Sequence, residues 1–204
     1  MKNIRELIKK ALEFQQNGLS EGQIADELNV SRETATWLMA HSPKGDLTQA
    51  PKDIYVNLAN IGRSAVRMRL IASALCDLFI ESLKKSGSNV DVVVGVDLNG
   101  IPIATLIAEE LEVELAVFQS SRKSQNKSTG VFSHNYAKVG GKDCIIVDDV
   151  ITSGRTVREV ISLLNEKKAT PTVAGVLIDK VGFDSIESVP VCSLFKISRI
   201  DKIE

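Results

Sequence analysis

Two adjacent carboxylates, Asp148 and Asp149, stand between an apolar run and a turn rich in hydroxyls and glycine. The apolar run, 144–147, predicts a strand buried on both faces, and the residues from Thr156 onward predict a helix. In an open parallel sheet, ligands bind beyond the carboxyl ends of the strands. A helix that begins there offers unpaired backbone N–H groups and a positive dipole end to a phosphate.

The turn itself supplies further donors. Thr152, Ser153 and Thr156 add hydroxyl groups, and Gly154 lets the backbone close on an anion. The two carboxylates would repel a phosphate, so we expect them to accept hydrogen bonds from sugar hydroxyls beside it. The segment predicts a ribose 5-phosphate site. The structural alternative is a strand-to-helix turn whose Asp-Asp pair merely caps the helix.

Residues 97–102 repeat this geometry after an earlier apolar run. Gly100 would permit close approach of the backbone, and a helix is predicted to follow. Farther along, the stretch from Gln119 to Lys142 holds five basic residues and no carboxylate. Its serines and glycines are typical of a mobile loop, and its charge suits a ligand with two phosphate groups. The alternative is an ordinary solvated surface loop.

The bulk composition narrows the class of protein. The chain has 204 residues and a formal net charge of −1, which indicates neither a nucleic-acid nor a membrane partner by overall field. No apolar run reaches about 18 residues, and the first helix is amphipathic and charged, so we expect a cytoplasmic protein without a membrane partner. Three widely spaced cysteines, Cys76, Cys144 and Cys192, are predicted to be small buried residues rather than metal ligands.

The first 42 residues predict three short helices. Apolar spacing predicts a helix that ends near 17–18, Ser20 begins a second helix over 21–29, and Ser31 begins a third that runs to Ala40. The predicted buried positions are Ile24, Ala25, Leu28, Val30, Ala35 and Leu38. Asn29 stands in the tight turn, where asparagine tolerates the left-handed region.

This pattern resembles a helix-turn-helix, whose second helix enters the major groove of DNA. The outward residues, which we expect to contact DNA, are Ser31, Arg32, Glu33, Thr36 and Trp37. Five basic and six acidic residues give this segment a charge of 5 − 6 = −1, whereas DNA-binding faces normally carry a basic excess. A three-helix interaction module is therefore the alternative.

The rest of the chain alternates between predicted strands and helices. Helices are predicted over 64–85, 103–111 and 156–168, and strands over 90–96, 113–118, 144–147 and 173–178. The first of these helices has Val66, Leu70, Ala74, Leu78 and Leu83 among its apolar positions. This order predicts an α/β fold with a parallel sheet and helices on both faces. We divide the chain into a helix-turn-helix domain (1–42), a linker or short wing (43–52) and an effector-binding domain (53–204).

Residues 144–156 resemble the 13-residue phosphoribosyl pyrophosphate (PRPP) motif of the type I phosphoribosyltransferases, and among these the orotate branch. The resemblance implies that the carboxylates bind ribose, that 152–156 binds the 5-phosphate, and that 98–100 binds pyrophosphate or its Mg²⁺, with Lys123 and Lys127 closing over it. The ligand-binding residues implied are Leu98, Asn99, Gly100, Arg122, Lys123, Lys127, Asp148, Asp149, Thr152, Ser153, Gly154, Arg155 and Thr156.

The resemblance breaks at the basic loop. Orotate phosphoribosyltransferases carry Arg-Lys-x-x-Lys-Asp-His-Gly there, whereas residues 122–130 have the second lysine displaced by one position and no histidine. Loss of a group that stabilises the leaving pyrophosphate would impair catalysis and spare ligand binding. We therefore predict no catalytic residue, with Lys123 and Lys127 as candidate pyrophosphate contacts only. Whether the chain is an enzyme stays open, and a non-enzymatic role is favoured.

The whole chain is similar to the archaeal GfcR family of orotate phosphoribosyltransferase-like regulators, which is linked to control of central sugar metabolism. The resemblance implies a homodimer that binds a DNA operator and senses PRPP or a nucleoside monophosphate. It implies no tightly bound cofactor and no metal held by protein alone, since Mg²⁺ would arrive with the phosphates of PRPP. The alternatives are an active orotate phosphoribosyltransferase and a PRPP-binding scaffold that does not bind DNA.

Overall fold

The computed structural model describes residues 2–45, 47, 50–120 and 130–198. The chain divides into two compact units, of which the first ends at Ala59 and the second begins at Asn60. Each unit has its own hydrophobic core, so each is described by itself.

The N-terminal unit contains three helices, α1 (Lys2–Gln16), α2 (Glu21–Glu27) and α3 (Arg32–Ala40). Ser20 and Gln23 form a capping box at the start of α2, and the Ser31 hydroxyl accepts the Thr34 N–H at the start of α3. Asn29 has the predicted left-handed conformation, with φ of 52°. The sequence thus predicted these helices to within two residues.

The core of this unit is the predicted one. All six predicted positions, from Ile24 to Leu38, are at most 3% exposed. The unit extends beyond the predicted boundary, however. The Asp53 carboxylate accepts the Ser31 N–H at 2.7 Å, and Tyr55 packs against the helical core. The proposed linker 43–52 has no strand among its described residues, and residues 53–59 belong with the helices rather than with the second domain.

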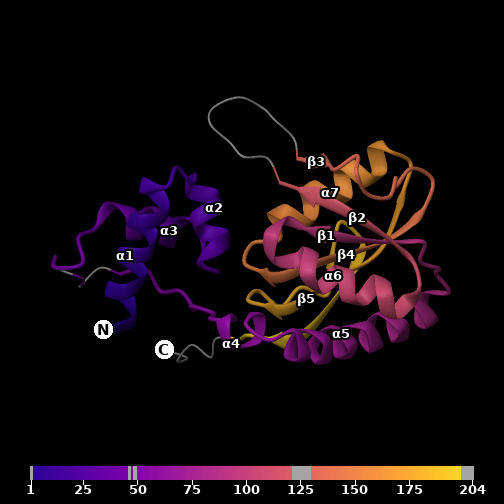
Figure 1. Ribbon diagram of the computed structural model, residues 1–204, viewed down its shortest axis with the longest axis horizontal. Coiled ribbons are helices and arrows are strands. Elements are labelled where there is room, and N and C mark those ends of the chain that lie inside the picture. The colour runs from indigo at the N-terminus through magenta and orange to yellow at the C-terminus, as the bar shows by residue number, and fades with distance from the viewer. Residues whose placement is uncertain (1, 46, 48–49, 121–129, 199–204) are drawn as a thin grey trace, which may run out of the picture. The chain divides into compact units, whose positions relative to one another are not determined.

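The second unit is an α/β layer structure (Figure 1). Its helices are α4 (Ala59–Gly62), α5 (Ala65–Ser86), α6 (Asp97–Leu111) and α7 (Arg155–Glu166). Its strands are β1 (Val92–Val96), β2 (Glu114–Gln119), β3 (Val131–Phe132), β4 (Asp143–Ile151), β5 (Thr170–Asp179), β6 (Ser185–Ile186) and β7 (Val189–Lys196).

The strand order is β3-β2-β1-β4-β5-β7-β6. Strands β2, β1, β4, β5 and β7 are parallel, and the two-residue strands β3 and β6 pair antiparallel at the edges. Helix α7 covers one face of this sheet, and α5 and α6 cover the other, which confirms the predicted fold class (Figure 1).

Glycines in one row of the sheet bring the second helix layer close. Gly95 and Gly175 pair on either side of Val147. A Cβ on Gly95 would lie 2.9 Å from Ala104 of α6, and one on Gly175 would lie 2.1 Å from the ring of Phe79 in α5. The two helices therefore rest directly on the backbone of the central strands.

Two sequence expectations need correction, and the buried face of α5 is an additional finding. Strand β4 continues past Val147 to Ile151, and α6 begins at Asp97 rather than near Ile103. In α5 the buried side chains are Ala72, Leu75, Cys76, Phe79 and Leu83, so only Leu83 of the apolar positions named from the sequence is buried. Val66 and Leu70 are 69% and 66% exposed.

Candidate functional site

Asp148 and Asp149 lie within β4, near its carboxyl end. Because side chains alternate along a strand, Asp148 shares the face of Ile146, which α7 covers, and Asp149 shares the opposite face with Val147. Asp148 is half-buried and Asp149 is 8% exposed. An oxygen of each carboxylate accepts the next backbone N–H, at 2.9 and 2.8 Å. The two carboxylates are therefore not equivalent, and Asp148 is the more accessible.

The turn after β4 leads directly into α7. Gly154 precedes the helix with φ of 71°, a left-handed conformation that favours glycine. In the described chain no side-chain hydrogen bond caps α7, so the N–H groups of its first turn remain available to an anion. Thr152 and Thr156 are half-buried beside them, and Ser153 and Arg155 are exposed. The predicted phosphate-binding residues therefore surround one helix N-terminus.

The first turn of α6 lies against the same part of β4. A Cβ on Gly100 would lie 2.5 Å from the Val147 carbonyl oxygen and 3.0 Å from the Asp148 Cα. Leu98 is 70% exposed, and Asn99 is half-buried. The structure thus brings the second predicted phosphate element beside the first. Residues 97–100, expected as a loop, form the start of the helix itself.

Both described ends of the basic segment are tied to these helices. The Ser120 N–H donates to the Asp97 carboxylate at 2.8 Å, and the Gly130 N–H donates to the Glu159 carboxylate of α7 at 2.6 Å. Asp97 has φ of 47°, an uncommon conformation for a residue other than glycine. Neither carboxylate was predicted to do this. Arg122, Lys123 and Lys127 lie outside the described residues.

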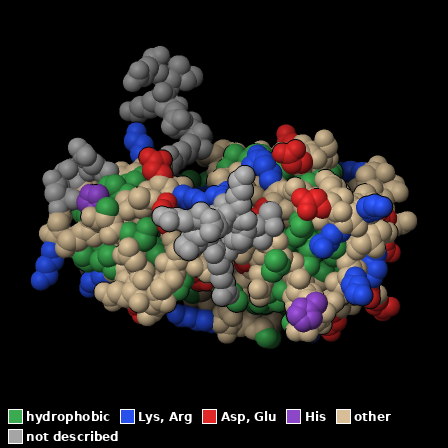
Figure 2. Space-filling model, turned by 90° about the horizontal axis from the view of Figure 1, so that it is seen from above, with side chains coloured by type: hydrophobic (Ala, Val, Ile, Leu, Met, Phe, Trp, Pro, Cys, Tyr) green, Lys and Arg blue, Asp and Glu red, His purple; other side chains and the backbone are tan. Residues whose placement is uncertain are grey.

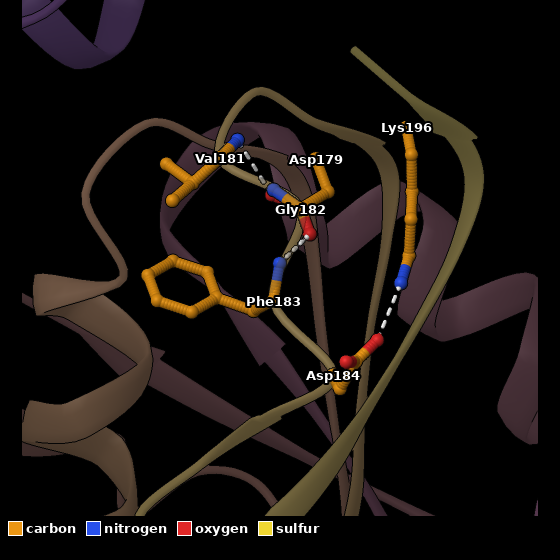
Figure 3. A network of polar contacts seen from close by, with 6 residues as sticks. All are labelled: Asp179, Val181, Gly182, Phe183, Asp184 and Lys196. Atoms are coloured by element: carbon orange, nitrogen blue, oxygen red, sulfur yellow. Dashed lines mark hydrogen bonds and ion pairs between the residues drawn. The ribbon is translucent and has the colours of Figure 1, made fainter. Parts of the chain in front are cut away.

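A further turn at the same edge of the sheet is organised by Asp179, the last residue of β5. Its buried carboxylate accepts the N–H groups of Val181, Gly182 and Phe183 at 2.9, 2.8 and 2.6 Å (Figure 3). An Asp side chain that bonds its own downstream backbone is a known turn device, but nothing in the sequence singled out Asp179. Lys180 follows it, and its N–H donates to the Ile151 carbonyl, next to the 152–156 turn.

In the N-terminal unit, only part of the predicted DNA-contacting set is outward. Arg32, Glu33 and Thr36 are exposed, whereas Ser31 serves as the cap of α3. Trp37 is half-buried, packs against the core and stacks on His41 with ring centroids 4.0 Å apart. Trp37 therefore covers part of the hydrophobic core and is less exposed than the sequence predicted.

Two of the outward residues of α3 contact α2. The Thr36 hydroxyl donates to the Glu21 carboxylate at 2.5 Å. The guanidinium of Arg32 lies over Gly22, where a Cβ would come within 2.9 Å of Arg32 Nη2. The two helices of the predicted motif are thus joined on their exposed side by one hydrogen bond and by packing of Arg32 on Gly22, as well as by their core.

The cysteines carry no evident reactivity. Burial raises the pKa of Cys144 to about 12 and that of Cys76 to about 11, so both thiols stay protonated at neutral pH. Burial also raises the pKa of Cys192, which is only half-buried, contrary to expectation. Within the described ranges, no group of three or more His, Cys, Asp or Glu side chains is placed to hold a metal ion.

The described helices include none with the length and apolar character needed to cross a membrane. On the face shown in Figure 2, basic and acidic side chains are interspersed, in keeping with the formal net charge of −1. This face therefore carries no patch of a single charge sign among its described residues.

Comparison with known proteins agrees with this architecture. The family model of the phosphoribosyl transferase domain matches residues 67–197. Among solved structures, the chain resembles an adenine phosphoribosyltransferase from Thermoanaerobacter pseudethanolicus, with a TM-score of 0.57 and 16% identity over 74% of this chain and 92% of that one. It also resembles the orotate phosphoribosyltransferase of Mycobacterium tuberculosis in complex with PRPP, with a TM-score of 0.55 and 16% identity over 70% and 80%. At this identity the likeness shows the fold.

Relatives of similar length are much closer in sequence. A protein of Methanosarcina barkeri named transcriptional regulator GfcR 2 is 54% identical over 202 residues, which cover 98% of this chain and all of the relative. A protein of Methanococcoides burtonii named transcriptional regulator GfcR is 51% identical over 203 residues, with the same coverage. The chain therefore belongs to the GfcR family, with a phosphoribosyl transferase domain as its α/β unit.

Proposed function

We propose that this protein is a DNA-binding transcriptional regulator whose α/β domain binds PRPP or a related phosphoribosyl ligand. The observation that carries the ligand half is the contact between Gly100 and the Val147–Asp148 backbone. This contact sets the first turn of α6 beside the turn that begins α7, so two helix N-termini share one edge of the sheet. A ligand with a 5-phosphate and a pyrophosphate suits that pair.

Each part of the ligand has a candidate partner. The half-buried Asp148 is the better of the two carboxylates to accept ribose hydroxyls, and the 152–156 turn would bind the 5-phosphate. The start of α6 would bind pyrophosphate, with Mg²⁺ bound chiefly by the ligand's own phosphates. Arg122, Lys123 and Lys127 remain candidate pyrophosphate contacts on the strength of the sequence alone.

Calorimetry with PRPP, ribose 5-phosphate, orotate and nucleoside monophosphates tests the ligand-binding part of this proposal. PRPP with Mg²⁺ is expected to bind one site per chain. If none of these ligands binds, the effector proposal fails, whatever the outcome for DNA.

The DNA half rests on the N-terminal unit and on the names of the relatives. Helices α2 and α3 form a capped pair with a left-handed Asn29 between them, and Arg32, Glu33 and Thr36 are exposed at the start of α3. These are the positions from which a recognition helix contacts base edges. Control of central sugar metabolism, which the family resemblance implies, is part of the proposal.

We propose further that the protein acts as a dimer. One short recognition helix reads few bases, so two copies on a two-fold axis would be needed for a specific operator. The α/β unit exposes two large apolar side chains one turn apart on α5, Val66 and Leu70, which self-association would cover. Sedimentation together with DNA binding to a selected operator tests this. A monomer at micromolar concentration would exclude a dimeric reader.

The competing function is orotate phosphoribosyl transfer. The departure of residues 122–130 from the catalytic loop pattern predicts that turnover is absent or very slow. Turnover of orotate and PRPP in the ordinary enzyme range of roughly 1–10³ per second would establish the enzyme instead.

A further inference from the structure

One arginine of α7 connects the 152–156 turn to the segment between β5 and β7. Arg158 Nη1 donates to the Ser153 carbonyl oxygen at 2.9 Å, inside the 152–156 turn. The Arg158 Nε lies 3.7 Å from the Glu187 carboxylate, and its guanidinium carbon lies 5.6 Å from the centre of the Phe183 ring. Phe183 and Glu187 both belong to the segment that joins β5 to β7.

The same segment packs on Gly154. A Cβ placed there would lie 3.0 Å from Ile186 Cδ1, 3.2 Å from Arg158 Nη1 and 3.2 Å from the Phe183 ring. Gly154, in its left-handed conformation, therefore packs closely against the side chains of Phe183, Ile186 and Arg158. Side-chain contacts from this segment and from Arg158 therefore hold the turn at Gly154.

The segment that packs on Gly154 is itself held in place by hydrogen bonds and by an ion pair. Asp179 accepts three successive backbone N–H groups of the 181–183 turn, and Lys196 of β7 pairs with Asp184 at 3.0 Å (Figure 3). Beyond it, Glu187 and Ser188 have φ of 48° and 68°, so the tight turn between β6 and β7 is also closely defined. Phe183 and Glu187 are thereby held where Arg158 meets them.

We propose that Arg158 is a positioning residue for the 5-phosphate, which acts by holding the Ser153 carbonyl and so aiming the N–H groups at the start of α7. The inference rests on the proposed phosphate site and adds a residue that does not touch the ligand. A carbonyl fixed by a charged donor cannot turn toward the anion, where it would repel the phosphate. Pre-organisation of this kind reduces the ordering that binding requires.

The test compares Arg158→Met, Arg158→Lys and a matched control, Arg69→Met. Arg69 also pairs with a carboxylate at 3.7 Å, that of Glu109, but it joins α5 to α6. Calorimetry with ribose 5-phosphate should show about a tenfold loss of affinity for Arg158→Met, an intermediate loss for Arg158→Lys and no change for Arg69→Met, because a turn without its charged donor must be ordered when the phosphate binds.

Hydrogen exchange of the ligand-free proteins separates positioning from other roles. Arg158→Met should speed exchange of the amides of 158–160, the first hydrogen-bonded turn of α7, and leave the central strands unchanged. Lower affinity with unchanged exchange in this turn would mean direct phosphate contact and overturn the proposal. Uniformly faster exchange would mean a general structural role and also overturn it. If the unsubstituted protein does not bind ribose 5-phosphate, the phosphate site fails, while exchange still decides whether Arg158 orders the turn.

Discussion

The two turns that lead from the sheet into α6 and α7 reach a similar place by different means. After β1 the helix begins at once, with Asp97 in a left-handed conformation and its carboxylate bonded to the Ser120 N–H. After β4 three residues intervene, and the left-handed position is filled by Gly154. The α6 turn places Asp97 in a strained backbone conformation and uses its side chain for a hydrogen bond, whereas the α7 turn avoids the strain with a glycine.

This difference suits the two turns to different roles. A glycine with open N–H groups around it suits a bound anion, because the backbone itself makes the contacts. A carboxylate that ties the start of α6 to Ser120 instead connects that turn to the end of β2 and the start of the basic segment. We infer that the α7 turn is built mainly for binding and the α6 turn also for connection. Four substitutions test the comparison.

The largest effect is expected for Gly100→Ala at the α6 turn. The new methyl group would lie 2.5 Å from the Val147 carbonyl, so helix and strand must separate, at a cost of about 3 kcal/mol in unfolding free energy. Urea denaturation measures it. Gly62→Ala is the control, because a Cβ there meets nothing within 4 Å and the change should be near neutral. Equal stability of the two variants would contradict the close contact.

Asp148→Asn should lower ligand affinity by about 2 kcal/mol, or about thirtyfold, through loss of charge-assisted hydrogen bonds to ribose. Calorimetry with PRPP measures it. Asp149→Asn should affect binding less and stability more, since Asp149 is only 8% exposed. Asp91→Asn, at the opposite edge of the sheet, removes the same charge and should change neither. Full affinity in the double Asp148/Asp149 variant would remove this site from consideration.

Gly154→Ala should lower the free energy of unfolding by about 1.5 kcal/mol, because the left-handed conformation costs a residue with a Cβ about this much. Gly141→Ala makes a matched control: its φ of 72° is nearly that of Gly154, but a Cβ there meets nothing within 4 Å. A larger loss of thermal stability is expected for Gly154→Ala than for Gly141→Ala, since its methyl group would also crowd Ile186 at 3.0 Å and Phe183 at 3.2 Å, and only Gly154→Ala should lose ribose 5-phosphate binding. Normal binding by that variant would show that the α7 turn tolerates a side chain.

The smallest effect is expected for Asp97→Asn, below about 0.5 kcal/mol, because asparagine also adopts the left-handed region and its amide oxygen can accept the Ser120 N–H. Asp97→Ala loses both properties and should cost about 1–2 kcal/mol. Denaturation of the pair measures the difference. If both variants behave alike, the Ser120 bond contributes nothing to the turn.

The sequence alone determined most of the helices and strands, and from it we predicted the kind of site that they carry. The apolar run before Asp148, the hydroxyls after it and the serine caps of α2 and α3 are local signals, and the structure places the helices and strands close to the predicted ranges. Local signals work here because capping, turn chemistry and burial periodicity each depend on residues only a few positions apart.

Only the tertiary structure decided which of these residues meet. Three sets of contacts join residues at least 23 positions apart in the sequence. They are the packing of Gly100 on β4, the hydrogen bonds from the ends of the basic segment to Asp97 and Glu159, and the packing of Gly154 on Phe183 and Ile186. Trp37 likewise packs against the core of the N-terminal unit and is only partly exposed. Contacts of this range leave no periodic trace in the sequence, since they depend on how the strands are ordered and how closely the helices approach them.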